Sequence, residues 1–395
     1  MDTTSRPHRL LLLVAAVANL LLTGLGIRWL IAPGTSVLAR LPTPPPLLDL
    51  IGPVPMHGAL VAVALVGAVT AATHLAPARG EALTARARPS VAGGRGPVAG
   101  SRWLIAVGLA QVLVFGLGFA SMATLSGIGY LIALAMPLLL VTIGVLLLRG
   151  AAPGGRLLGA ALLILSAAGL VLGRGIIGDL AAEMVPALLG MTGQLLLVGH
   201  LVLVGTVWAA LIVLAARSAE DGGPRRVEAW VIRHRRPLTL LAACGPLPYA
   251  LLRLTWLTPW PLLGGMVAEA DVATRVWGLT LSAGAWLGVI LTLGLIRPWG
   301  EVFPRWIPGV GGRPVPLAVV AVPGFTIAAL LIFAAAPMVF SVSIIGPSMM
   351  LAFALVFPCW LWGPALALAV WGYLGHRRTT SVARPGTAPS ARMGA

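Results

Sequence analysis

The residues that could carry chemistry in this chain are few, and several of them lie inside long apolar runs. Asn19, Gln111 and His200 each fall well inside such a run, and Gln194 lies six residues before His200. His200 could relay a proton or contact a substrate, because an imidazole ring changes its charge near neutral pH. The alternative is a hydrogen bond between two packed helices. The middle of these runs carries no Asp or Glu, which argues against ion coupling through a carboxylate.

A second group of polar residues borders the apolar runs, and Arg253 is its most informative member. Arg253 follows Tyr249 by four residues, so the two side chains share one face of a helix. An unpaired guanidinium costs about 3 kcal/mol at the centre of a bilayer, so we expect a partner. Glu269 and Asp271 are the nearest acidic residues in the sequence. Two interpretations stand: a cleft for a polar or anionic headgroup, or a snorkelling arginine with surface ion pairs.

The composition places these residues in lipid. The chain has 395 residues, of which 58% are hydrophobic and 10% are charged, and its mean hydropathy is +0.98. Soluble globular proteins carry about 25% charged residues. These values exclude a soluble enzyme, a disordered chain and a fibrous repeat, and they predict an all-α, polytopic integral membrane protein. The two cysteines, Cys244 and Cys359, lie in apolar runs, where we expect small buried side chains rather than a disulfide or a metal pair.

Ten apolar segments are each long enough to cross a bilayer, which takes roughly 20 residues. We expect one transmembrane helical domain over residues 1–374 and a disordered tail over residues 375–395. The first apolar run exceeds the 7–15 or so residues of a signal peptide's apolar region, so we expect a retained helix. Prolines interrupt the segments near Gly245-Pro246 and from Pro358 to Pro364, where we expect helix breaks. The predicted spans are 10–32, 56–76, 103–124, 128–148, 157–176, 187–214, 238–256, 276–296, 317–336 and 349–371.

The arginines predict how the chain is oriented. All 27 basic residues are arginines, a usage typical of GC-rich bacterial genomes. With ten spans and the N-terminus inside, the inner segments hold 22 arginines and six acidic residues, and the outer segments hold five of each. The inner face then carries the whole formal net charge of +16, which predicts cytoplasmic N- and C-termini in a bacterial inner membrane. We therefore expect membrane lipids as partners, with anionic inner-leaflet headgroups at the arginine-rich loops, and no nucleic acid.

Two of the predicted inner loops have a pattern of their own. Residues 220–237 either form a short amphipathic helix on the inner surface or carry stop-transfer charges. The other loop alternates aromatic residues, prolines and charges, and we expect it on the inner interface, with Glu301 able to pair with Arg297 or Arg305. Its sequence is Arg297-Pro298-Trp299-Gly300-Glu301-Val302-Phe303-Pro304-Arg305-Trp306-Ile307-Pro308. Over residues 297–316 this segment resembles a loop of an uncharacterised family of bacterial multi-pass integral membrane proteins. The resemblance implies no reaction, substrate or catalytic residue.

Three functions remain open at this stage. A transporter or permease for a small molecule or lipid is favoured by the span count, the helix breaks and the deep polar residues, and it predicts that these residues converge on one cavity. A non-catalytic assembly or sensory partner is the second function. The third is a membrane-embedded enzyme acting on a lipid-linked substrate, which would use His57, Asp49 and Arg253. We predict no catalytic residue, cofactor or metal. The candidate substrate-binding residues are Arg253, Tyr249, His57, Asp49, Glu269, Asp271, His200, Gln194, Gln111 and Asn19.

Overall fold

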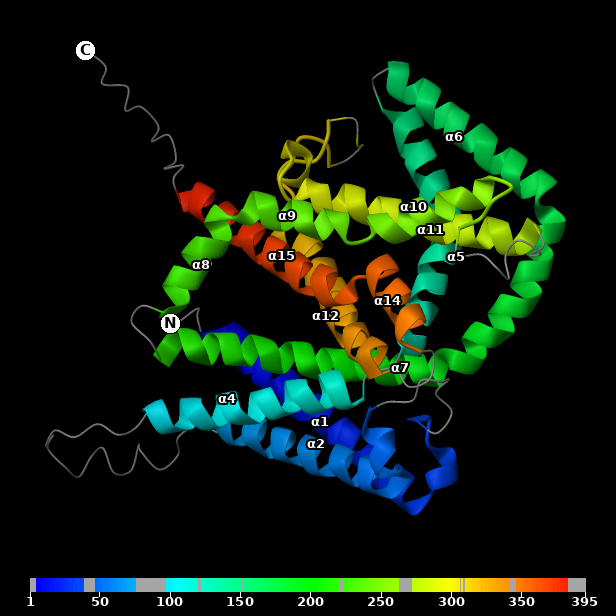
Figure 1. Ribbon diagram of the computed structural model, residues 1–395. Helices are drawn as coiled ribbons and strands as arrows, with labels where there is room; N and C mark the ends of the chain where they lie inside the picture. The colour runs from blue at the N-terminus through cyan, green and yellow to red at the C-terminus, as the bar shows by residue number, and fades with distance from the viewer. Residues whose placement is uncertain are drawn as a thin grey trace, which may run out of the picture. The chain divides into compact units, whose positions relative to one another are not determined.

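The computed structural model of the chain is all-α (Figure 1). It describes residues 5–38, 47–75, 97–119, 122–150, 153–219, 223–262, 272–305, 307, 310–340 and 346–382. Within these residues, seven helices are long and apolar enough to cross a membrane: His8–Ile31, Pro53–Leu75, Pro153–Leu172, Leu188–Ala215, Arg235–Leu257, Leu317–Ala335 and Met350–Thr380. Shorter apolar helices, Arg102–Gly118, Ala135–Arg149 and Gly278–Gly294, fall in the other three predicted spans. The prediction of an all-α, multi-pass membrane protein is therefore confirmed, and the count of ten spans and the orientation of the termini stay predictions.

The chain forms two compact units, and the single transmembrane domain stays a prediction. Unit 1 comprises Met1–Tyr130, Ala181–Pro224 and Ala329–Leu355. Unit 2 comprises Leu131–Leu180, Arg225–Ala328 and Val356–Ala395. The boundaries pass through α5 (Met122–Arg149), α7 (Arg174–Ala219), α8 (Gly223–Arg233), α12 (Leu317–Phe340) and α14 (Pro347–Val356).

Unit 1 is built on three helices that lie side by side: α1 (Ser5–Ile31), α2 (Pro53–Leu75) and α4 (Pro97–Leu113) (Figure 1, blue to cyan). The 3-10 turns η1 (Pro33–Thr35) and η3 (Leu47–Ile51) lie between α1 and α2, and a π-helical turn, η4 (Val114–Gly118), follows α4. Gly52 has a φ of 89°, a left-handed conformation that glycine adopts without strain, and Pro53 then starts α2 with its φ already helical. The core of this unit contains the large buried side chains of Trp29, Phe115, Phe119, Leu201 and Trp208.

Unit 2 contains the helices that hold the second group of candidate residues. Two of them, α9 (Arg235–Cys244) and α10 (Leu247–Leu254), pack on α11 (Val272–Gly294), and α9 also packs along α15 (Cys359–Val382). The same unit includes α6 (Pro153–Leu172) and the 3-10 turns η5 (Thr255–Leu257) and η6 (Pro298–Gly300). A Cβ built on Gly245 would overlap the Trp362 side chain, so the turn between α9 and α10 can approach α15 this closely because residue 245 is glycine.

Helix breaks follow the prolines in two places, whereas other prolines lie inside unbroken helices. The predicted span 238–256 divides into α9 and α10 at Gly245-Pro246, and the predicted span 349–371 divides into α14 and α15 at Phe357-Pro358. Pro364, expected to break the last span, lies inside α15, and Pro186 lies inside the 46-residue helix α7. Membrane helices tolerate an interior proline because neighbouring groups re-satisfy the freed carbonyl.

The segments at the ends of the predicted spans also differ from expectation. Residues 177–186, expected as a loop, are part of α7. The start of the predicted disordered tail is helical, since α15 continues to Val382, and residues 383–395 lie outside the described part. Of the two cysteines, which are both free, Cys359 is buried as expected and Cys244 is exposed.

Candidate functional site

Three of the deep polar residues of unit 1, Asn19, Gln111 and His200, lie near the middle of apolar helices. Asn19 is the twelfth residue of the 24-residue span His8–Ile31, and His200 is the thirteenth residue of the 28-residue span Leu188–Ala215. A Cβ built on Gly67 of α2 would lie 2.8 Å from Asn19 Oδ1 and would overlap the Gln111 amide nitrogen. We call Asn19, Gly67, Gln111 and His200 the mid-span cluster. Glycine at position 67 lets two amide side chains from α1 and α4 approach the same point on α2.

Hydrogen bonds from the mid-span cluster connect the helices of unit 1. Gln111 Nε2 donates to the carbonyl oxygen of Val63 in α2 at 2.5 Å, and Asn19 Nδ2 donates within α1 to Ala15 O at 2.9 Å. His200 Nε2 lies 2.8 Å from Ala18 O, next to Asn19. Because a carbonyl oxygen can only accept, this contact assigns the ring proton to Nε2 and leaves Nδ1 as an acceptor in the neutral ring.

The carbonyl ends of the two amides are the unusual feature of the mid-span cluster. Asn19 and Gln111 are both fully buried, at 0% exposure. Within the described part of the chain, neither Asn19 Oδ1 nor Gln111 Oε1 has a hydrogen-bond partner. The amide orientation is consistent with the contacts, since a flip of either group would place oxygen against the carbonyl that now accepts from its nitrogen. Two acceptor oxygens of the same cluster are therefore buried without a hydrogen-bond partner within the described residues.

Gln194, the fourth deep polar residue, lies half-buried on α7, six residues before His200. The structure brings Asn19 and Gln111 together and places the His200 ring on the adjacent carbonyl of α1. Both amides are fully buried and closed to solvent in this conformation, whereas we expected them to line a water-accessible cavity.

His57 and Asp49 lie at the end of unit 1 where α1 and α2 are connected. The His57 ring is buried, with its Nε2 2.9 Å from Ser36 Oγ and its centroid 5.6 Å from that of Trp29. Asp49 is exposed in η3, near enough for its charge to act on His57. A serine beside a histidine is the pairing used in nucleophilic catalysis. Ser36 and His57 are both buried, however, so this contact joins the η1 turn to the first turn of α2 and is closed to a substrate.

Replacing Ser36 with alanine is expected to lower the free energy of unfolding by about 1–3 kcal/mol, because His57 Nε2 would be left buried without a partner. Thermal unfolding of the purified protein in detergent measures the loss. The control is Thr35→Ala at the neighbouring exposed position, whose hydroxyl bonds only locally to Ala32 O. An equal effect of the two substitutions would contradict a special role for the Ser36–His57 contact.

In unit 2, Arg253 is surrounded by aromatic rings. Its guanidinium carbon lies 3.7 Å from the ring centroid of Trp256 and 5.1 Å from that of Tyr249, and the Tyr249 ring lies 4.4 Å from that of Phe357. A Cβ on Gly278 of α11 would lie 2.9 Å from an Arg253 η nitrogen. The expected helix-face neighbour, Tyr249, is therefore present, and Trp256 was not predicted. The expected acidic partners, Glu269 and Asp271, lie outside the described residues.

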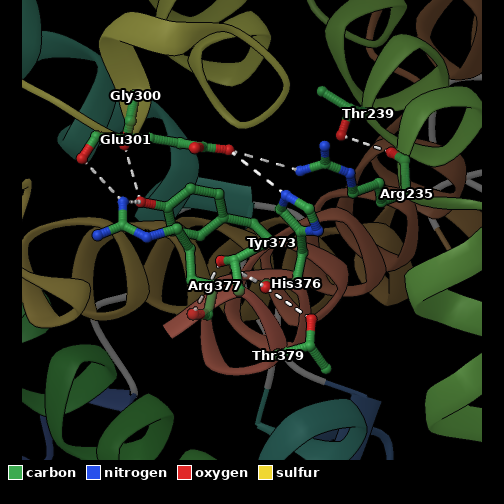
Figure 2. A network of polar contacts seen from close by, with 9 residues as sticks. Arg235, Thr239, Gly300, Glu301, Tyr373, His376, Arg377 and Thr379 are labelled. Carbon is green, nitrogen blue, oxygen red and sulfur yellow. Dashed lines mark hydrogen bonds and ion pairs between the residues drawn. The ribbon is translucent and has the colours of Figure 1, made fainter. Parts of the chain in front are cut away.

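Glu301 lies at the centre of a network of polar contacts in unit 2 (Figure 2). The Glu301 carboxylate lies 3.8 Å from Arg235 of α9 and 3.6 Å from His376 of α15. The backbone of the same loop is held by α15, because the Tyr373 hydroxyl donates to Gly300 O at 2.8 Å and Arg377 donates to Glu301 O at 2.9 Å. We call Arg235, Glu301, Tyr373, His376 and Arg377 the Glu301 network.

The Glu301 network attaches described parts of the distinctive loop 297–316 to α15. A single β-bridge joins Val302 to Pro314, and Arg377 donates to both Tyr373 Oη at 3.0 Å and Val315 O at 3.3 Å. Glu301, which its loop would allow to pair with Arg297 or Arg305, instead lies within ion-pair distance of Arg235 of α9 and beside the His376 ring of α15. The spacing of Tyr373 and Arg377 places both side chains on one helix face, but it gives no signal for their contacts with a loop more than 60 residues away in the sequence.

Comparisons with known proteins leave the classification at the level of architecture. No protein-family model matches the chain, and neither a curated protein nor a solved structure shows significant similarity to it. The resemblance of residues 297–316 to uncharacterised bacterial membrane proteins therefore stays a prediction. The structure shows a multi-pass helical membrane protein.

Proposed function

We propose that this protein is a transporter or permease for a small uncharged solute that carries O–H or N–H groups. The observation that carries the proposal is the pair of buried amide oxygens, Asn19 Oδ1 and Gln111 Oε1, that face no donor within the described residues. A buried acceptor without a partner costs about 1–3 kcal/mol. A pair of such atoms at mid-span depth is better explained by a ligand that supplies the donors than by packing.

The charges around the mid-span cluster favour a neutral solute over an ion. Residues 12–24, 57–71 and 104–116, which surround the cluster on α1, α2 and α4, include no Asp, Glu or Arg. An ion at this depth would need a counter-charge or a set of several oxygen ligands. Amide oxygens and an imidazole nitrogen instead match the hydroxyl and amine donors of a polar, uncharged molecule.

Two structural features support movement at the mid-span cluster. The π-helical turn η4 starts three residues after Gln111, and π-helical turns are frequent at functional sites. The full burial of both amides corresponds to a closed conformation, which alternating access requires at one stage of the cycle. Opening would involve separation of α4 from α1 and α2 near Gly67, where contact depends on the absence of a side chain.

The test is solute permeation into vesicles that contain the purified full-length chain. Glycerol and urea serve as probes, since both are small, uncharged and rich in donors, and vesicle swelling is followed by light scattering after rapid mixing. We expect at least one probe to enter faster than it enters protein-free vesicles of the same lipid. Entry at the protein-free rate for both probes, with the protein shown to be folded and inserted, would overturn the proposal. A parallel assay with a fluorescent phospholipid detects a lipid cargo, which would also overturn the uncharged-solute proposal.

A further inference from the structure

We propose that α8 is an in-plane anchor that binds the surface of an anionic lipid bilayer. The helix ends at Arg233, and the candidate span Arg235–Leu257 starts two residues later, so α8 lies at the boundary between membrane and water. Figure 1 shows α8 meeting α9 at an angle near the end of α15. A helix that turns away from the axis of the adjacent span at the membrane boundary can lie along the membrane surface.

One side of α8 is already occupied by unit 2. Val231 is buried, and a Cβ built on Gly375 of α15 would lie 2.6 Å from Ile232 and 3.9 Å from the Glu228 carboxylate. A Cβ on Gly372 would lie 3.1 Å from the backbone oxygen of Val231. Two small residues on α15 thus let the backbone of α8 approach closely, and they fix which side of α8 faces outward. The single carboxylate of α8, that of Glu228, is on the packed side.

The outward side of α8 combines apolar and cationic side chains. Val227 and Trp230 are each 50% exposed although both are large and apolar, and Arg226 and Arg233 are exposed beside them. Spacings of three and four residues place these four side chains on the same surface of the helix. Arg236, in the first turn of α9, adds another exposed cation.

This combination fits an anionic bilayer surface more closely than it fits a protein partner. Tryptophan and valine at the depth of the headgroups can insert among the upper acyl carbons, while arginine guanidiniums bind the phosphates above them. The His234 ring stacks on Trp230 with centroids 4.6 Å apart, and its Nδ1 lies 2.8 Å from Trp230 O. These two contacts hold the indole at the start of the span, which is the depth that interfacial tryptophans prefer.

The experiment measures the immersion of α8 directly in the full-length protein. A nitroxide label is attached at Val227→Cys in a C244A/C359A background and studied in nanodiscs of phosphatidylcholine alone or mixed equally with phosphatidylglycerol. Collision with oxygen reports lipid, and collision with a water-soluble nickel chelate reports water. We expect phosphatidylglycerol to raise the ratio of immersed to exposed label by about fivefold for each arginine that reaches the headgroups. The R226Q/R233Q variant should lose this dependence on anionic lipid.

The matched control is R28Q/R174Q, which removes two exposed arginines at the opposite predicted ends of spans and should keep the dependence. The role of the arginines would be overturned if the label were equally immersed with and without phosphatidylglycerol. It would also be overturned if R28Q/R174Q lost the dependence on anionic lipid as much as R226Q/R233Q does. A label that water reaches in both mixtures would overturn the anchor itself. A label shielded from both reagents would identify a protein on this surface and would also overturn the proposal. None of these outcomes depends on solute permeation, so the anchor and the transport function can fail separately.

Discussion

Replacing Gln111 or Asn19 with leucine is expected to reduce solute permeation at least tenfold while the protein stays as stable as the parent or gains about 1 kcal/mol. Leucine fills a similar volume and removes an acceptor oxygen that is buried without a donor. The carbonyls that lose a side-chain donor, Val63 O and Ala15 O, are in helices and keep their backbone bonds. Residues retained for ligand binding commonly reduce stability, so loss of function without loss of stability is the expected signature.

Permeation of glycerol and urea and the thermal unfolding midpoint, measured on the same preparations, test this expectation. The control is Thr142→Val on α5, which also removes a polar group from a membrane helix but acts on a local contact with Leu138 O. Unchanged permeation in the leucine variants would refute the binding role of the amides. A clear fall in stability together with lost permeation would show that the amides serve mainly to join α1, α2 and α4.

A large loss of stability is expected from Arg377→Lys. The guanidinium donates to two backbone oxygens of the loop, Glu301 O at 2.9 Å and Val315 O at 3.3 Å, and to Tyr373 Oη on its own helix at 3.0 Å. A lysine ammonium cannot reproduce this planar fork of donors. With two charge-assisted hydrogen bonds lost, and a discount for partial exposure, we expect a fall of about 2–3 kcal/mol in the free energy of unfolding. The loop 297–316 should loosen before the helices do.

Thermal unfolding and limited trypsin digestion check the effect of Arg377→Lys. Trypsin cuts poorly before proline, so Arg297-Pro298 and Arg313-Pro314 resist cleavage and the bond after Arg305 reports on the loop. Faster cleavage after Arg305 is expected in the variant. The control is Arg236→Lys, at an exposed position next to Arg235, and trypsin should cut this variant after Arg305 as slowly as it cuts the parent. Identical digestion of both variants would show that Arg377 does not restrain the loop.

The helices could be predicted from the sequence because lipid leaves few alternatives for the backbone. A chain in hydrocarbon must satisfy every peptide group within the segment, so long apolar runs become helices. The positions of the breaks were harder to predict. Pro246 and Pro358 interrupt helices, whereas Pro186 and Pro364 do not. The same residue type has both outcomes because neighbouring helices decide whether the freed carbonyl is satisfied, and neighbours are not visible in a linear pattern.

Some of the candidate residues could be predicted from the sequence, because their residue type stood out, but the residues they contact could not. Asn19, Gln111 and His200 were identifiable because polar groups in apolar runs are costly and therefore informative. Gly67, where the two amides meet, gave no signal in a chain with 49 glycines. The partners of Glu301 were missed because local spacing favoured Arg297 and Arg305, whereas Arg235 and His376 come from distant segments. Long-range pairs of this kind depend on how helices pack, which one sequence does not specify.

The attachment of the 297–316 loop to α15 has a consequence for the order of biosynthesis. Proteins are made and begin to fold from the N-terminus. Arg377, which binds the Glu301 backbone, is synthesised 76 residues after it, and Tyr373 follows Gly300 by 73 residues. The loop therefore has no anchor on α15 while α12 and α14 are entering the membrane. Insertion of the final helix completes the assembly, so a chain truncated before α15 would contain most of its spans but leave the loop without its α15 contacts and more open to proteases.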